Sequence, residues 1–245
     1  MEYRISGYLY FAEDCQLVLE HPLSYQRENL QISIKNNSKS NQNRQLDITL
    51  RIDSKDKESA VIKVENELDR ISDLISWFYN DVPVVKWGIS RIEDSRGVGT
   101  ATATVPLSAR FCRPKNLDDE DIKKFKNQLV RDYSDDFEEI LIMWREALTE
   151  QSKGLKFFLF YRILERLCDG KPGEERKRVE KWIKAKEKDI EMRESKGKLV
   201  TIYTFLRDNI HAKDSRFPYA DIEKYLPRLQ KLTKEKIQEV FSREK

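Results

Sequence analysis

The sequence contains few of the residues from which catalytic and metal sites are usually built. Its three cysteines, Cys15, Cys112 and Cys168, lie far apart among 245 residues and share no spacing typical of metal ligands. This pattern excludes a disulfide-framed secreted domain and a cysteine-based zinc site, and it favours a reducing compartment. We therefore expect no metal ion and no other cofactor.

Long apolar runs are also missing. No stretch approaches the roughly 20 apolar residues that a membrane-spanning helix needs, and the N-terminus lacks the charged and then apolar layout of a signal peptide. Only eight residues are glycine, and SRGVGT at 95–100 lacks the lysine and the strand-to-helix setting of a phosphate-binding P-loop. By elimination, we expect a cytoplasmic protein that does not contact membranes.

The first part of the chain alternates apolar and polar residues, which is the pattern of half-buried strands. Strands are predicted at 3–11, 15–20, 30–35, 45–53, 84–92 and 100–107. Apolar residues in 59–79 instead recur at helical spacing, with Ser59 as the expected N-cap. Residues 1–113 are therefore predicted to form a β-rich α+β domain. Because no catalytic motif lies in it, we expect it to serve recognition or assembly, for example by binding a protein partner or inhibitor.

From the charge run FCRPKNLDDED at 111–121 onward, the pattern is helical. We place the domain boundary there and predict a helical bundle over residues 114–245. Its central helix is expected within 154–170, because GLKFFLFYRILERLCDG is the most apolar stretch in the chain. A basic helix is expected within 170–198 and a last helix at 218–241. The predicted fold class is α+β, a β-rich domain followed by an all-α bundle.

Positive charge is concentrated in the last third of the chain. The whole sequence carries a net charge of +3, whereas residues 170–245 hold 21 basic and 14 acidic residues, a net charge of +7. A local positive field is typical of proteins that bind a phosphate-bearing partner. Lysine-rich helix surfaces are also commonly just solvated, so both interpretations stay open.

The stretch LVTIYTFLRDNIHAKD at 199–214 combines an apolar stripe with two residues suited to phosphate chemistry. The stripe predicts a helix and consists of Leu199, Ile202, Tyr203, Leu206 and Ile210. Arg207 and His211 stand four residues apart, so on one helix they would be neighbours able to reach a single phosphate group. The only other histidine, His21, precedes Pro22 and is expected to be a turn residue.

Glu165 interrupts the apolar stripe of the predicted central helix. A buried carboxylate is usually paired, because an isolated charge in an apolar interior is very costly. One interpretation is a carboxylate at the rim that faces water, or one that pairs with the nearby Arg162 or Arg166. The other is a carboxylate that orients Arg207 or His211 across a helix interface.

Two segments, KFFLFYRILERL at 156–167 and YTFLRDNIHAKD at 203–214, resemble the HEPN superfamily (higher eukaryote and prokaryote nucleotide-binding domains). The resemblance covers roughly residues 116–245. It implies a helical bundle fused to a β-rich domain, as in some anti-phage and toxin-like proteins, with RNA as the substrate and a homodimer as the assembly. Three residues separate Arg207 from His211, fewer than is common in the family, which leaves open a branch with lost or altered catalysis.

The resemblance implies a metal-independent ribonuclease site formed by Arg207, Asp208 and His211. His211 is expected to act as general acid or base, and Arg207 to stabilise the pentacoordinate phosphate. Glu165 or Asp208 would hold the imidazole or the guanidinium in place, so Glu165 is included among the catalytic residues. The residues expected to contact the substrate are Asn209, Tyr161 and Lys213. A cyclic phosphate product is expected, because the 2′-hydroxyl of the RNA would be the nucleophile.

Two alternatives from other functional classes remain. The first is a catalytically silent HEPN-like module that binds nucleic acid or nucleotide through its basic face while the N-terminal domain recruits a partner. The second is a structural adaptor in which His211 is a core residue. Phosphate binding that survives His211→Ala, with no cleavage by either form, would identify the first.

Overall fold

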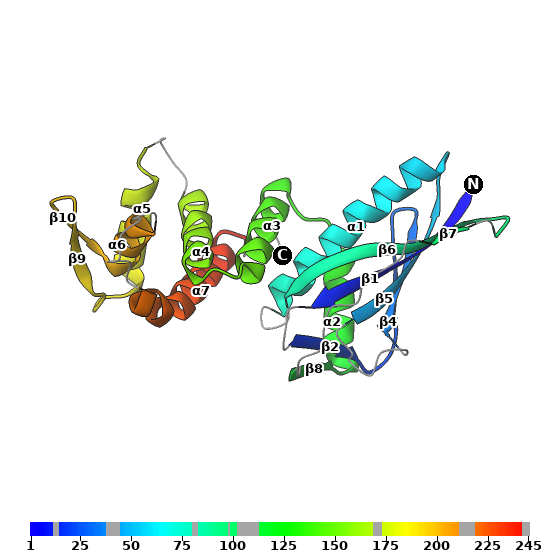
Figure 1. The fold of residues 1–245 in the computed structure, drawn as a ribbon, viewed down its shortest axis with the longest axis horizontal. Helices are drawn as coiled ribbons and strands as arrows, with labels where there is room; N and C mark the ends of the chain where they lie inside the picture. The colour runs from blue at the N-terminus through cyan, green and yellow to red at the C-terminus, as the bar shows by residue number, and fades with distance from the viewer. Residues whose placement is uncertain are drawn as a thin grey trace. The chain divides into compact units, whose positions relative to one another are not determined.

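The chain forms a mixed α+β structure, with an antiparallel sheet near the N-terminus and helices toward the C-terminus (Figure 1). The computed structural model describes residues 1–11, 15–37, 45–79, 83–97, 99–101, 113–168, 173–210 and 219–241. It divides the chain into two compact units, Met1–Ser134 and Asp135–Lys245. Within the described ranges, no helix is long and apolar enough to cross a lipid bilayer.

Six strands of the first unit form one antiparallel sheet in the order β3-β4-β5-β1-β6-β7. Their bounds are β1 (Glu2–Phe11), β3 (Leu23–Arg27), β4 (Leu30–Asn36), β5 (Gln45–Asp53), β6 (Val84–Asp94) and β7 (Gly99–Ala101). Burial alternates along β5, where Leu46, Ile48, Leu50 and Ile52 are all buried. The alternating sequence pattern therefore predicted which face of the strands lies in the core. Of the strand predicted at 100–107, residues 102–107 lie outside the described ranges.

Helix α1 (Lys57–Phe78) covers one face of this sheet (Figure 1). Its apolar stripe is almost fully buried, as the helical spacing predicted. The N-cap is Asp56 and not Ser59 as predicted, because the Asp56 carboxylate accepts the Ser59 amide at 2.8 Å. The helix therefore begins one turn earlier than the first apolar residues indicated.

The boundary between the units lies after Ser134, later than the predicted boundary after residue 113. Strand β8 (Arg113–Leu117) pairs in parallel with β2 (Cys15–Leu19), and α2 (Asp119–Leu129) packs against α1. The Arg70 side chain of α1 donates a hydrogen bond to the Leu129 carbonyl. The ring centroids of Phe125 and Tyr79 lie 5.4 Å apart. These contacts place β8 and α2 in the first unit, because a short strand and a short amphipathic helix cannot bury their apolar sides alone.

The second unit consists of helices and one hairpin around α4. Its elements are α3 (Asp135–Thr149), α4 (Lys153–Leu167), α5 (Glu175–Lys186), β9 (Met192–Ser195), β10 (Lys198–Thr201), α6 (Ile202–Asn209) and α7 (Tyr219–Phe241). Helix α4 contacts α3, α5, α6 and α7, and its Phe157, Phe160 and Leu164 have no exposed surface. The predicted central position of this apolar helix is confirmed, and so is the last helix predicted at 218–241.

Residues 187–201 differ from their predicted helical structure. The basic helix α5 ends at Lys186, and β9 and β10 then form an antiparallel hairpin with Ser195 paired to Lys198. Lys196 and Gly197 make its two-residue turn with φ of 51° and 72°, as a type I′ hairpin requires. Leu199 belongs to β10 and is 66% exposed, so it is not part of the buried stripe predicted for 199–214. Helix α6 begins three residues later and ends at Asn209.

Candidate functional site

Helix α6 is short and is fixed at both ends. The Thr201 hydroxyl accepts the Thr204 amide at 3.4 Å and caps the first turn. Ile202, Tyr203 and Leu206 are fully buried and attach the helix to the core. Arg207 lies in the last turn, where the helix dipole favours a cation, and its side chain is 28% exposed.

Glu165 lies near the C-terminal end of α4 and is shared by two guanidinium groups. Its Oε1 accepts Arg207 Nη2 at 2.9 Å, and its Oε2 accepts Arg162 Nη1 at 2.9 Å. The residue is only 5% exposed, so this double pairing offsets the cost of burying its charge. Both interpretations of Glu165 from the sequence hold in part, since it pairs with Arg162 and also orients Arg207. Arg166 pairs instead with Glu139.

Asp208, the residue after Arg207, joins α6 to α5 and to the hairpin. Its Oδ1 accepts Arg207 Nη1 at 3.2 Å, and its Oδ2 lies 2.7 Å from Arg176 Nη2 of α5. The Ser195 hydroxyl of β9 also donates to Oδ2 at 3.2 Å. The aspartate therefore ties three elements of the second unit together.

We call Arg162, Glu165, Arg176, Arg207 and Asp208 the arginine cluster. Its carboxylates are buried, whereas its arginine side chains are 28% to 53% exposed. Three guanidiniums face two carboxylates, so the cluster has a formal charge of +1. Such an arrangement holds the cations in fixed positions while leaving donors for a further anion.

Tyr161 supports Arg207 from within the core. The guanidinium carbon lies 5.9 Å from the ring centroid, and the phenol oxygen lies 2.7 Å from the Thr204 hydroxyl. Burial raises the pKa of Tyr161 well above its usual value, so the hydroxyl stays neutral. Tyr161 is predicted to contact the substrate, and in the structure its side chain is fully buried.

Another buried carboxylate, Glu180 of α5, fixes the start of α6. Its Oε1 accepts both the amide and the hydroxyl of Thr201, at 2.9 and 2.7 Å. Burial alone would raise the pKa of Glu180, but hydrogen bonds from the Thr204 and Thr201 hydroxyls and the Thr201 amide hold this pKa below its usual value. The carboxylate is therefore ionised at neutral pH and orients the helix that carries Arg207.

None of the remaining predicted site residues belongs to the arginine cluster as the described part of the chain shows it. The Asn209 side-chain amide donates to the Phe205 carbonyl of its own helix at 2.7 Å, so this donor is already engaged. His211 and Lys213 lie outside the described residues. In the described part of the chain, no group of three or more histidine, cysteine or acidic side chains is arranged to hold a metal ion.

Sequence reasoning missed Arg176 and Ser195 as members of this region. Arg176 stands in a strongly charged helix where nothing distinguishes it from its neighbours. The sequence Ser-Lys-Gly-Lys at 195–198 did contain a hairpin signal, because a glycine in a two-residue polar turn is typical of type I′ geometry. Recognising that hairpin would have placed β9 beside α6, although not Ser195 beside Asp208.

The chain was also compared with known proteins. No protein-family model, curated protein or solved structure matches it.

Proposed function

We propose that the second unit is a metal-independent endoribonuclease of the HEPN type that acts in a defence or toxin-like role. The observation that carries the proposal is the setting of Arg207 at the end of α6. Its guanidinium lies over Tyr161 and between two buried carboxylates, Glu165 and Asp208, while part of it remains exposed. A preorganised guanidinium of this kind is suited to stabilising the charge that develops on a phosphate during cleavage.

The proposed reaction needs only protein groups and the RNA itself. The 2′-hydroxyl attacks the neighbouring phosphorus, the bond to the 5′-oxygen breaks, and the products are a 2′,3′-cyclic phosphate and a 5′-hydroxyl. His211 is the proposed general acid or base, because an imidazole changes protonation near neutral pH. Arg207 donates hydrogen bonds to the phosphate oxygens in the pentacoordinate transition state.

Glu165 and Asp208 are positioning residues in this proposal and not catalytic residues. Each uses one oxygen to hold a terminal nitrogen of Arg207 and the other to bind a second arginine. The remaining hydrogens on both terminal nitrogens of Arg207 are left for the substrate. A second copy of the chain is the proposed partner that completes the site.

The test is cleavage of mixed RNA by the purified chain and by Arg207→Ala and His211→Ala, each with and without EDTA. We expect cutting by the wild type that EDTA does not change, and a loss of about 10²-fold or more in both variants. Arg166→Ala is the matched control, because it removes an arginine of α4 that pairs with Glu139 outside the cluster. Undiminished cutting by His211→Ala would remove the assignment.

The second candidate is a catalytically silent module that binds RNA or nucleotides. It is favoured by the pairing of Arg207 with two carboxylates, which offsets the positive charge of the guanidinium. It is also favoured by the short spacing between Arg207 and His211. The same set of proteins separates the two candidates. Silent binding predicts RNA affinity that depends on Arg207 but not on His211, with no cleavage by any form.

A further inference from the structure

The second face of the six-stranded sheet, opposite α1, is polar. Along β4 the apolar residues Leu30, Ile32 and Ile34 are buried, whereas Gln31 and Lys35, at alternate positions on the opposite face, are exposed. On β1, Arg4 is exposed between buried Tyr3 and Ile5. Among the described residues no helix contacts this face as α1 contacts the other.

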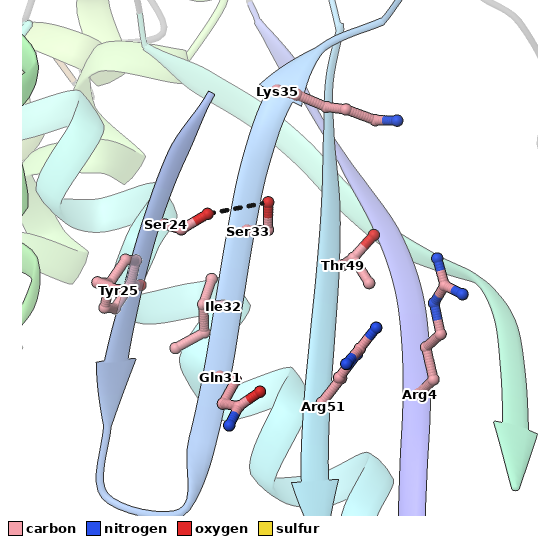
Figure 2. A pocket seen from close by; sticks show the side chains of 9 residues that line it. All are labelled: Arg4, Ser24, Tyr25, Gln31, Ile32, Ser33, Lys35, Thr49 and Arg51. Carbon is pink, nitrogen blue, oxygen red and sulfur yellow. Dashed lines mark hydrogen bonds between the residues drawn. The ribbon is translucent and has the colours of Figure 1, made fainter. Parts of the chain in front are cut away.

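Strand register brings the polar residues of four strands together on this face. Arg4 of β1 stands directly opposite Arg51 of β5. One row further along, Ser33 of β4 pairs with both Ser24 of β3 and Thr49 of β5. Figure 2 shows these side chains on neighbouring strands, with the Ser24 and Ser33 hydroxyls hydrogen-bonded at 3.2 Å.

These residues line an open groove of about 530 Å³. Its cations are Arg4, Lys35 and Arg51, its hydroxyl groups belong mainly to Ser24, Ser33 and Thr49, and none of its described lining residues is a carboxylate (Figure 2). Lys35 lies four residues along β4 from Gln31, the cross-strand partner of Arg51. The cations are thus spread over about 13 Å in the strand direction.

The pairing of Arg4 with Arg51 is unfavourable by itself. Like charges placed directly opposite each other across two strands repel, and neither arginine forms an ion pair with a described residue. Carboxylates do lie near the groove, at both ends. Asp47 of β5, which accepts a hydrogen bond from the Gln45 side chain, stands directly opposite Lys35. Glu93, opposite Arg4, is paired with Arg91 at 2.6 Å, and Glu2 and Asp53, in the next row, lie beyond ion-pair distance. An anion between the two guanidiniums would relieve the repulsion.

We infer that this groove binds the sugar-phosphate backbone of single-stranded RNA through Arg4, Arg51 and Lys35, with little selection among bases. Phosphates are bound in proteins by arginine, lysine and hydroxyl side chains, which are the groups that line the groove. That the polyanion is RNA rests on the proposed function, because the groove would then hold substrate for the second unit. Binding of this sequence-independent kind is expected at about 10⁻⁴ to 10⁻⁶ M at physiological salt.

The lining favours a nucleic acid over an acidic protein segment. Stable protein interfaces are anchored by aromatic and apolar side chains that fill pockets. The apolar side chains at this groove, Tyr25 and Ile32, are 6% and 2% exposed, so they offer almost no surface to an anchor. Interfaces with nucleic acids are more polar and more positive, as this lining is.

The test is fluorescence anisotropy of a labelled 2′-O-methyl oligouridine, which cannot be cleaved, titrated with the full chain over a series of salt concentrations. Arg4→Ser combined with Arg51→Ser is expected to weaken binding roughly tenfold for each lost phosphate contact at 0.1 M salt and to lower the salt slope by about one per contact. Lys55→Ser combined with Lys63→Ser is the matched control, because it removes two exposed cations from elsewhere in the same unit. Equal losses in the two double variants would overturn the inference.

A second variant distinguishes a loss of RNA binding from a loss of folding. Thr49→Glu places a carboxylate one row along the same face from the two opposed arginines, so we expect it to abolish binding while thermal unfolding shows a stability at least equal to that of the wild type. Polyglutamate of the same charge is the competitor, and displacement of the RNA at equal charge concentration would assign the groove to acidic protein segments instead. Repeating the titration with Arg207→Ala separates the proposals, because RNA binding should persist there even if the chain cuts no RNA.

Discussion

At the scale of single residues, the arginine cluster depends on shared partners. Arg207 holds Glu165 and Asp208, and each carboxylate also holds a second arginine, Arg162 or Arg176. Removing Arg207 therefore leaves both buried carboxylates paired. Removing a carboxylate takes a partner from two arginines at once, so the two kinds of variant should separate loss of function from loss of stability.

Glu165→Gln should lower the free energy of unfolding by about 2 kcal/mol, because a neutral amide replaces a buried charge that accepts two charged hydrogen bonds. Glu139→Gln is the control. It disrupts an ion pair with Arg166 in which both side chains are about half exposed, and it should change stability by less than about 0.5 kcal/mol. Urea unfolding at neutral pH measures both, and equal effects would contradict the role given to Glu165.

Glu180 gives a pH dependence with a definite sign. Its pKa in the folded chain is lowered, so its ionised form stabilises the fold above the unfolded pKa of about 4.3, and this stability is lost as the pH falls through the folded pKa. Glu180→Gln should therefore be less stable than the wild type by about 1 to 2 kcal/mol at pH 7. The difference should shrink below pH 4. Urea unfolding at both pH values tests this, and a difference independent of pH would show that the carboxylate charge is unimportant.

Part of this site was predictable from residue types. A carboxylate on an apolar helix and an arginine beside an apolar stripe are each expected to seek a partner, and Glu165 and Arg207 do pair. Arg176 and Ser195 were not predictable, because their contact with Asp208 depends on how α5 and the hairpin pack against α6. For Tyr161 the helical pattern predicted the face of α4 on which it lies but not the depth of its burial.

At the scale of elements, the β9–β10 hairpin connects α5 to α6 and places Ser195 beside Asp208. The hairpin was not predicted, since Leu199 fits the helical stripe expected for residues 199–214 as well as it fits a strand. Local pattern cannot separate these possibilities over four residues, and the turn residues decide the structure. The long periodic elements α1, α4, β1, β4, β5 and β6 were predictable because many residues repeat the same spacing, whereas the five-residue strand β3 was not predicted.

The hairpin turn can be tested in two directions. Gly197→Val should lower the free energy of unfolding by about 1 kcal/mol or more, because a β-branched residue is strained at a φ of 72° although the space around the position is open. Lys196→Asn should be neutral or slightly stabilising, because asparagine tolerates the left-handed region better than lysine does. Thermal unfolding of both variants measures the effect. Two equal losses would contradict the type I′ turn.

At the scale of the whole molecule, the chain consists of two compact units whose boundary the sequence placed too early. The described part of the charge run, residues 113–121, forms β8 and the start of α2, and these two elements complete the first unit. Composition alone could not show this, because the run of charges before a helix is typical of a linker as well as of a helix N-terminus.

A fragment of residues 1–134 should unfold cooperatively, whereas residues 1–113 should be several kcal/mol less stable or fail to fold. The shorter fragment lacks most of β8, which pairs with β2, and all of α2, whose Phe125 and Leu129 are buried. Circular dichroism with urea titration of both fragments is the measurement. Equal stability of the two fragments would support the predicted domain boundary after residue 113.

The central claim is that Arg207 stabilises the transition state in which the 2′-hydroxyl of the RNA attacks the neighbouring phosphate. The most direct measurement is the single-turnover rate at which Arg207→Ala, shown to be folded by circular dichroism, cuts an RNA that the wild type cuts, with the 3′ ends identified by mass spectrometry. We expect cyclic phosphate ends from the wild type and a rate about 10² to 10³ times lower for the variant. A variant that cuts at the wild-type rate, or wild-type products with 3′-hydroxyl ends, would contradict the claim.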